Sequence, residues 1–95
     1  MTTEQLRHLN TIVDHYGAEH QQKKAVEECK ELVEEIEYAL AGENNRKGII
    51  DEIADVEIMI EQLKIIYSCK KEVESRINYK IERQIKRILG KYNLK

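Results

Sequence analysis

Apolar residues recur at steps of three and four along most of this chain, and nowhere do they alternate with a period of two. Steps of three and four place side chains on one face of an α-helix, whereas alternation is typical of a half-buried strand. Proline is absent, and glycine interrupts the pattern at Gly17 and around Gly42 and Gly48. The sequence therefore predicts an all-α fold without strands.

We expect four helices, over residues 3–16, 18–41, 46–67 and 69–89. Thr2 and Gln5 have the spacing of a capping box at the start of the first helix. Ser68 is expected to cap the fourth helix, and Gly90 to end it. The short loop between the second and third helices favours antiparallel packing. We predict one domain, residues 1–95, with a four-helix antiparallel arrangement.

The apolar stripes predict which helix faces are buried. On the second helix the stripe consists of Ala25, Cys29, Leu32, Ile36 and Ala39 or Leu40. On the third helix it consists of Ile49, Ile53, Val56, Ile60 and Leu63, widened by further apolar residues, so this helix should be the most buried. One subunit would leave that broad face poorly covered. Because a 95-residue core is also marginal, we expect oligomerisation to complete the fold.

The net charge of −2 conceals a strong asymmetry along the chain. Residues 1–63 contain six Lys/Arg and 15 Asp/Glu, a net charge of −9, whereas residues 64–95 contain ten and three, a net charge of +7. This pattern fits internal charge complementarity or a metal site beside a phosphate site. The overall balance argues against a dedicated nucleic-acid binder. Binding of nucleic acid through the basic fourth helix remains an alternative, and it predicts a steep salt dependence.

Cysteine usage and hydropathy bear on where the protein works. The two cysteines, Cys29 and Cys69, form neither a disulfide framework nor a CxxC zinc signature, so we expect free thiols in a reducing cytoplasm. No apolar run approaches the roughly 20 residues of a membrane span. The first residues lack a basic segment followed by an apolar one, so we expect no signal peptide and no membrane partner.

Two short acidic motifs stand on the second and third predicted helices. Glu28 and Glu31 are three residues apart, as are Glu52 and Asp55. On a helix this spacing puts each pair on one face, about one turn apart. Two such helices side by side could direct four carboxylates at one point, and oxygen-only ligands suit Mg²⁺ or Mn²⁺. The alternative is that Glu-rich helices simply have solvated acidic faces.

Two further polar residues align with the first acidic pair. Gln21 and Lys24 precede Glu28 and Glu31 at steps of three and four, so the four side chains share a face. Lys24 and Glu28 also have the spacing of an ordinary helical ion pair, worth a few tenths of a kcal/mol. For Lys24 taken alone, that ordinary pairing is the better interpretation.

The order of these motifs resembles a known family. The stretch from Gln21 to Leu32 (QQKKAVEECKEL), followed by residues 51–56 (DEIADV), is similar to the MazG-like all-α nucleoside triphosphate pyrophosphohydrolases. Their signature is ExxE, a variable gap and then ExxD. Tyr16-Gly17 before these motifs and residues 79–83 (YKIER) after them also resemble the small bacterial and phage members. The resemblance covers roughly residues 15–88.

This resemblance implies a function and a set of site residues. The family hydrolyses a nucleoside triphosphate, NTP or dNTP, to the monophosphate and pyrophosphate with Mg²⁺, and assembles as homodimers or homotetramers. A role in clearing unwanted nucleotides is also implied. By position, Glu28, Glu31, Glu52 and Asp55 correspond to the catalytic metal ligands. Lys80 and Arg83 match basic positions that meet the phosphates, and Gln21 and Lys24 match the motif as candidates for substrate binding.

Two alternatives stay open. The phosphoribosyl-ATP pyrophosphohydrolases have similar helices and acidic motifs, but they usually have a histidine soon after the position of Asp55, and this chain has none there. A non-catalytic homo-oligomeric helical interaction module would explain the periodicity, although not the order of the motifs.

Overall fold

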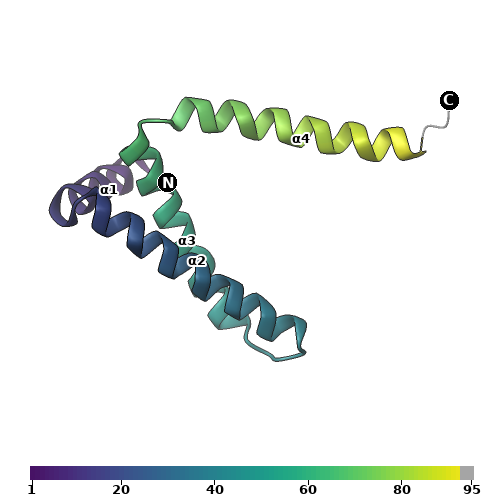
Figure 1. Cartoon of the computed structure of the whole chain (residues 1–95), viewed down its shortest axis with the longest axis horizontal. Coiled ribbons are helices and arrows are strands. Elements are labelled where there is room, and N and C mark those ends of the chain that lie inside the picture. The colour runs from purple at the N-terminus through teal and green to yellow at the C-terminus, as the bar shows by residue number, and fades with distance from the viewer. Residues whose placement is uncertain (93–95) are drawn as a thin grey trace.

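The protein is all-helical. The computed structural model describes residues 1–92, with side chains described through Gly90. Its four helices are α1 (Thr3–Tyr16), α2 (Ala18–Leu40), α3 (Arg46–Tyr67) and α4 (Lys70–Tyr92), and residues 1–92 contain no strand (Figure 1). Within the same residues, none of the helices combines the length and the apolarity that a membrane crossing requires. The all-α prediction and the bounds of the first three helices, to within one residue, are confirmed.

Local hydrogen bonding explains where α1 begins and ends. Thr2 accepts a hydrogen bond from the Gln5 backbone N–H, and the Gln5 side chain accepts one from the Thr2 backbone, so the predicted capping box forms. Gly17 follows with a φ of 90°, a conformation that glycine adopts without a Cβ clash. The chain therefore turns at one residue and α2 begins at once.

α2 and α3 form an antiparallel pair, which we call the α2–α3 hairpin (Figure 1). Its turn is held by the Asn45 side-chain amide, which donates to the Glu35 backbone carbonyl at 2.8 Å and to the Glu35 carboxylate at 2.6 Å. Gly48 lies against that carboxylate, and a Cβ there would come within 2.6 Å of Glu35 Oε2. The absence of a side chain at Gly48 lets the pinned carboxylate fit between the helices.

The face of α2 that packs on α3 differs from the predicted stripe. Gln21, Ala25 and Glu28 are the buried residues of α2, whereas Cys29 and Ile36 are exposed, so the prediction that those two face the core is wrong. The physical reason is polar pairing across the interface. Gln21 Nε2 donates to Gln62 Oε1 on α3 at 2.8 Å, and the small side chain of Ala25 occupies the neighbouring turn. The spacing of apolar residues in the sequence does not reveal such a polar pair.

α3 is the central helix, because α1, α2 and α4 all approach it. Its buried residues are Met59 and Gln62, whereas Ile53 and Ile60 from the predicted stripe are 45% and 43% exposed. The central position of α3 agrees with the prediction, but its buried face is narrower than predicted. Part of the broad apolar face is uncovered in one chain, as the sequence suggested.

The start of α4 agrees with the prediction to within one residue, but its predicted cap and its predicted end are wrong. Ser68 is the C-cap of α3, in the left-handed region at φ 49°, and does not cap α4. Its N–H bonds to the Ile65 carbonyl, and Cys69 N–H bonds to the Lys64 carbonyl. The helix continues through Gly90 to Tyr92, so Gly90 is not a stop. α4 then runs away from the other helices instead of folding back along α3, which departs from a fully antiparallel four-helix arrangement (Figure 1).

This arrangement is extended for its length. The Cα radius of gyration is 17.1 Å, whereas a compact domain of 95 residues would have about 12 Å. Among the described residues, only Leu9, Ala25 and Met59 are buried apolar residues, and no side chain is completely enclosed. The apolar core of a single chain is therefore thin, so the polar contacts within it matter more to stability.

We predict that Gln62→Leu destabilises the fold by about 1–3 kcal/mol, because it leaves the buried Gln21 amide without its acceptor. Urea denaturation followed by circular dichroism, at several protein concentrations, measures this. The double variant Gln21→Leu/Gln62→Leu should lose less than the sum of the two single variants, because neither polar group is then orphaned. Strictly additive losses would show that the two amides do not depend on each other.

Candidate metal centre

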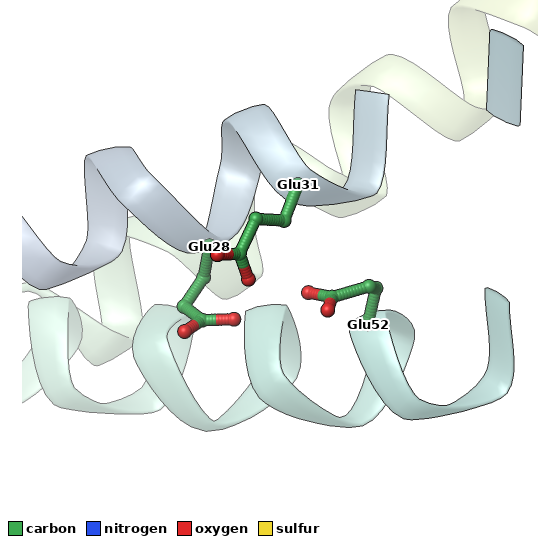
Figure 2. A group of neighbouring side chains, drawn as sticks. All are labelled: Glu28, Glu31 and Glu52. Atoms are coloured by element: carbon green, nitrogen blue, oxygen red, sulfur yellow. The ribbon is translucent and has the colours of Figure 1, made fainter. Parts of the chain in front are cut away.

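Three carboxylates converge between α2 and α3. Glu28 and Glu31 extend from α2, and Glu52 extends from α3 toward the same space (Figure 2). One carboxylate oxygen from each lies within 4.8 Å of one from each of the others. We call these residues the acidic trio.

The fold explains why the trio forms. Glu28 and Ala25 are three residues apart, so Glu28 enters the α2–α3 interface one turn after the small alanine. The antiparallel course of α3 brings Glu52 opposite. Glu28 is buried at 8% exposure, Glu52 is half-buried and Glu31 is exposed. The three carboxylates of the trio therefore range from buried at Glu28 to exposed at Glu31.

Two oxygen atoms of the trio are buried without a hydrogen bond. Glu28 Oε2 and Glu52 Oε2 are both inaccessible to solvent, and neither has a donor within the part of the chain that the structure describes. A buried carboxylate oxygen without a donor or a counter-charge is costly. Buried carboxylate oxygens without a donor, on two members of a group of three converging carboxylates, are what a cation site requires of its ligands.

Partial burial and neighbouring negative charge raise the pKa values of two carboxyl groups on α3. Loss of hydration, followed by interaction with the Glu28 carboxyl and the charge of Glu31, raises the pKa of Glu52 from 4.5 to about 7. Loss of hydration and the charge of Glu28 also raise the pKa of Asp55 above its usual value. Without a cation, the site therefore holds a proton at a pH where an ordinary glutamate is ionised.

Lys24 is the basic group beside the trio. Its Nζ lies 3.4 Å from Glu28 Oε1 and 3.6 Å from Glu27 Oε2, and the side chain is 48% exposed. The hydrogen bond to Glu28 and the charge of Glu27 raise the pKa of Lys24. The ordinary helical pairing with Glu28 is confirmed. Because Lys24 contacts only one oxygen of Glu28, it does not neutralise the site as a whole.

Gln21 lies next to the site but is engaged within the protein. Its amide nitrogen donates to Gln62, and its Oε1 lies 2.7 Å from His20 Nδ1. The side chain is 5% exposed. A contact between Gln21 and a substrate therefore stays a prediction, whereas its contact with α3 is present. Gln62 was missed in the sequence, where its only signal was an amide between apolar residues of the α3 pattern.

The structure does not gather every residue that the sequence suggested. Asp55 lies outside the acidic trio, although the charge of Glu28 reaches it. Lys80 and Arg83 lie on α4, which approaches only α3 among the described elements and extends away from the α2–α3 hairpin (Figure 1). Arg83 and Arg76 pack instead over the Tyr79 ring. A phosphate contact by Lys80 and Arg83 stays a prediction.

The donor set fits a hard divalent cation. All three ligands offer carboxylate oxygen, and no nitrogen or sulfur ligand belongs to the group. Mg²⁺ and Mn²⁺ favour oxygen donors, and Mg²⁺ usually keeps several waters while it binds one or two carboxylates and substrate phosphates. The exposed side at Glu31 leaves room for such waters or phosphates.

Comparisons with family models, with curated proteins and with solved structures found no match to this chain. The resemblance to the MazG-like enzymes therefore depends on the motifs quoted above.

We predict that the protein without metal is more stable near pH 5 than near pH 8. The folded state binds a proton at Glu52 up to about pH 7, whereas the unfolded chain loses it near pH 4.5. Stability is therefore lost as the pH rises through this window. Thermal unfolding in EDTA across the range measures it, and Glu52→Gln should flatten the slope.

The matched control is Glu37→Gln, which removes an exposed glutamate of α2 outside the trio. This variant should keep the wild-type dependence on pH. An unchanged slope in Glu52→Gln would contradict the assignment of the proton to Glu52. Mg²⁺ should raise the melting temperature most at the alkaline end, where the carboxylates are ionised.

Proposed function

We propose that the protein is a Mg²⁺-dependent nucleoside triphosphate pyrophosphohydrolase, which converts an NTP or dNTP and water to the monophosphate and pyrophosphate. The observation that carries the proposal is the pair of buried, unpartnered oxygens of Glu28 and Glu52 beside Glu31. We infer the type of reaction from the order of the acidic motifs and from their resemblance to the MazG-like family. Mn²⁺ is an acceptable substitute on the same oxygen donors.

Each group of the site has a role in this proposal. Glu28 and Glu52 would hold the cation from the buried side, and Glu31 from the solvent side. Asp55, next to Glu28, completes the set as a fourth carboxylate. When bound, a divalent ion neutralises phosphate charge and lowers the pKa of a water molecule.

The remaining groups handle the proton and the substrate. Glu31 is the trio member with the most exposed carboxylate, so it is assigned to accept the proton of the attacking water. Lys24, half exposed and next to Glu28, is the cation available to a phosphate oxygen. Gln21 positions α2 against α3 through Gln62. Lys80 and Arg83 lie on α4, which extends away from the α2–α3 hairpin in a single chain, and their contact with a phosphate stays a prediction.

Location and assembly belong to the same proposal. The free cysteines Cys29 and Cys69 fit a reducing cytoplasm, which also contains the nucleotide pool. The thin core of one chain favours a homodimer or homotetramer. A function in removing unwanted nucleotides follows from the resemblance.

We predict that purified protein releases pyrophosphate from at least one member of a panel of NTPs and dNTPs with Mg²⁺, and none in EDTA. Glu28→Gln and Asp55→Asn should lower the rate by at least about 100-fold, because even outer-shell partners of metal ligands contribute 10–100-fold. Glu37→Gln should keep the wild-type rate. Isothermal titration with Mg²⁺ alone should show binding that Glu28→Gln weakens.

The alternative is a non-catalytic helical interaction module, which the many half-exposed apolar residues favour. Absence of turnover on every nucleotide, together with absence of Mg²⁺ binding, would support the module. Mg²⁺ binding without turnover would leave a structural cation site and refute the hydrolase.

A further inference from the structure

α4 presents a long apolar stripe that stays largely exposed in the part of the chain that the structure describes. The stripe consists of Val73, Ile77, Ile81, Ile85 and Ile88. Ile77, Ile81, Ile85 and Ile88 are between 46% and 57% exposed. From Val73 to Ile88 the stripe is about 22 Å long at 1.5 Å per residue. An amphipathic helix with this pattern is the kind of element that lies in an apolar groove.

The α2–α3 hairpin carries a groove of matching kind. It has a volume of about 780 Å³ and is lined mainly by Ala25, Val26, Cys29, Val33, Leu63 and Tyr67. Gln22 and Glu34 mark its ends on α2, which are about 18 Å apart. Exposed Ile53 and Ile60 extend the same side of α3. The length and apolar character of this groove therefore suit the α4 stripe.

The groove is separate from the acidic trio. At 100° per residue, Val26, Cys29 and Val33 lie on the flank of α2 opposite Lys24 and Glu31. Occupation of the groove therefore does not require the cation site, and this inference does not depend on the proposed enzymatic function.

The exposed surface of one chain is larger than a stable monomer of this mass would have. The accessible surface is 7883 Å², whereas a compact 11.2 kDa monomer would expose about 5,700 Å². The excess of about 2,200 Å² per chain exceeds the roughly 800 Å² that each partner buries in a standard interface. It falls in the range of obligate homodimers when both chains are counted.

The opposite charges of the two parts of the chain favour a second copy of the same chain as the partner. Residues 1–63 have a net charge of −9, and residues 64–95 a net charge of +7. A basic α4 is therefore attracted to the acidic hairpin of any copy of the chain. The two halves of the same sequence complement each other in charge and in apolar surface.

We propose that α4 of one copy docks in the α2–α3 groove of a second copy, and that α4 of the second copy docks in the α2–α3 groove of the first. The pairing is self-complementary and closes as a two-fold dimer. A connection of only two residues, Ser68 and Cys69, links α3 to α4, and both N–H groups are bonded back to the end of α3. This cap directs α4 away from its own hairpin and toward a neighbour.

Native Cys29 in the groove gives a direct test. One copy carries Cys69→Ser and keeps Cys29. A second, differently tagged copy carries Cys29→Ser, Cys69→Ser and either Ile81→Cys or Ile85→Cys on the stripe. After mixing, exchange and mild oxidation, a disulfide should join the two tags. Lys86→Cys, on the opposite face of α4, is the matched control and should cross-link at least about 10-fold less.

Wild-type protein supplies the second measurement, because it needs no variant. Sedimentation equilibrium should give twice the chain mass at micromolar concentration. A monomer at all concentrations would overturn the proposal. So would a disulfide formed within one chain that keeps Cys29 and carries Ile81→Cys, since the occupant would then be the chain's own α4. Cross-links between two α4 stripes, with none to Cys29, would also overturn it.

Discussion

The packing of α2 against α3 brings carboxylates of like charge together between the two helices. Ala25 and the Gln21–Gln62 hydrogen bond bring the helices into register, and that register places Glu28 beside Glu52. Loss of hydration, together with the neighbouring carboxyl of Glu28 and the charge of Glu31, raises the pKa of Glu52 to about 7, and the ion pair of Lys24 with Glu28 does not offset this. A bound divalent cation would relieve this conflict, and the function proposed above follows from it.

The interface between α2 and α3 also explains which parts of the fold could be predicted from the sequence. Helix type, helix number and the bounds of α1, α2 and α3 follow from apolar periodicity, a capping box at Thr2 and glycine at position 17, all of which are local signals. The carboxylates of the trio were readable because three-residue spacing on a helix fixes a common face. Their convergence needed only the short antiparallel connection between α2 and α3.

Features that depend on contacts between distant residues were not readable. Cys29 and Ile36 looked like core residues because periodicity counts apolar side chains, whereas the buried positions belong to Gln21 and Glu28, which are selected by partners on α3. Ser68 looked like an N-cap because its side chain suits that position, but the backbone of α3 uses it as a left-handed C-cap. The direction of α4 follows from that cap, and no local pattern encodes it.

The acidic trio and the apolar groove lie on two flanks of the α2–α3 hairpin, and we propose chemistry for the first and assembly for the second. The central claim is that the acidic trio binds a divalent ion, and anomalous diffraction from crystals grown with Mn²⁺ tests it most directly. We predict an anomalous peak at bonding distance from carboxylate oxygens of Glu28, Glu31 and Glu52. Mn²⁺ peaks only elsewhere, with the three carboxylates turned apart toward bulk water, would contradict it.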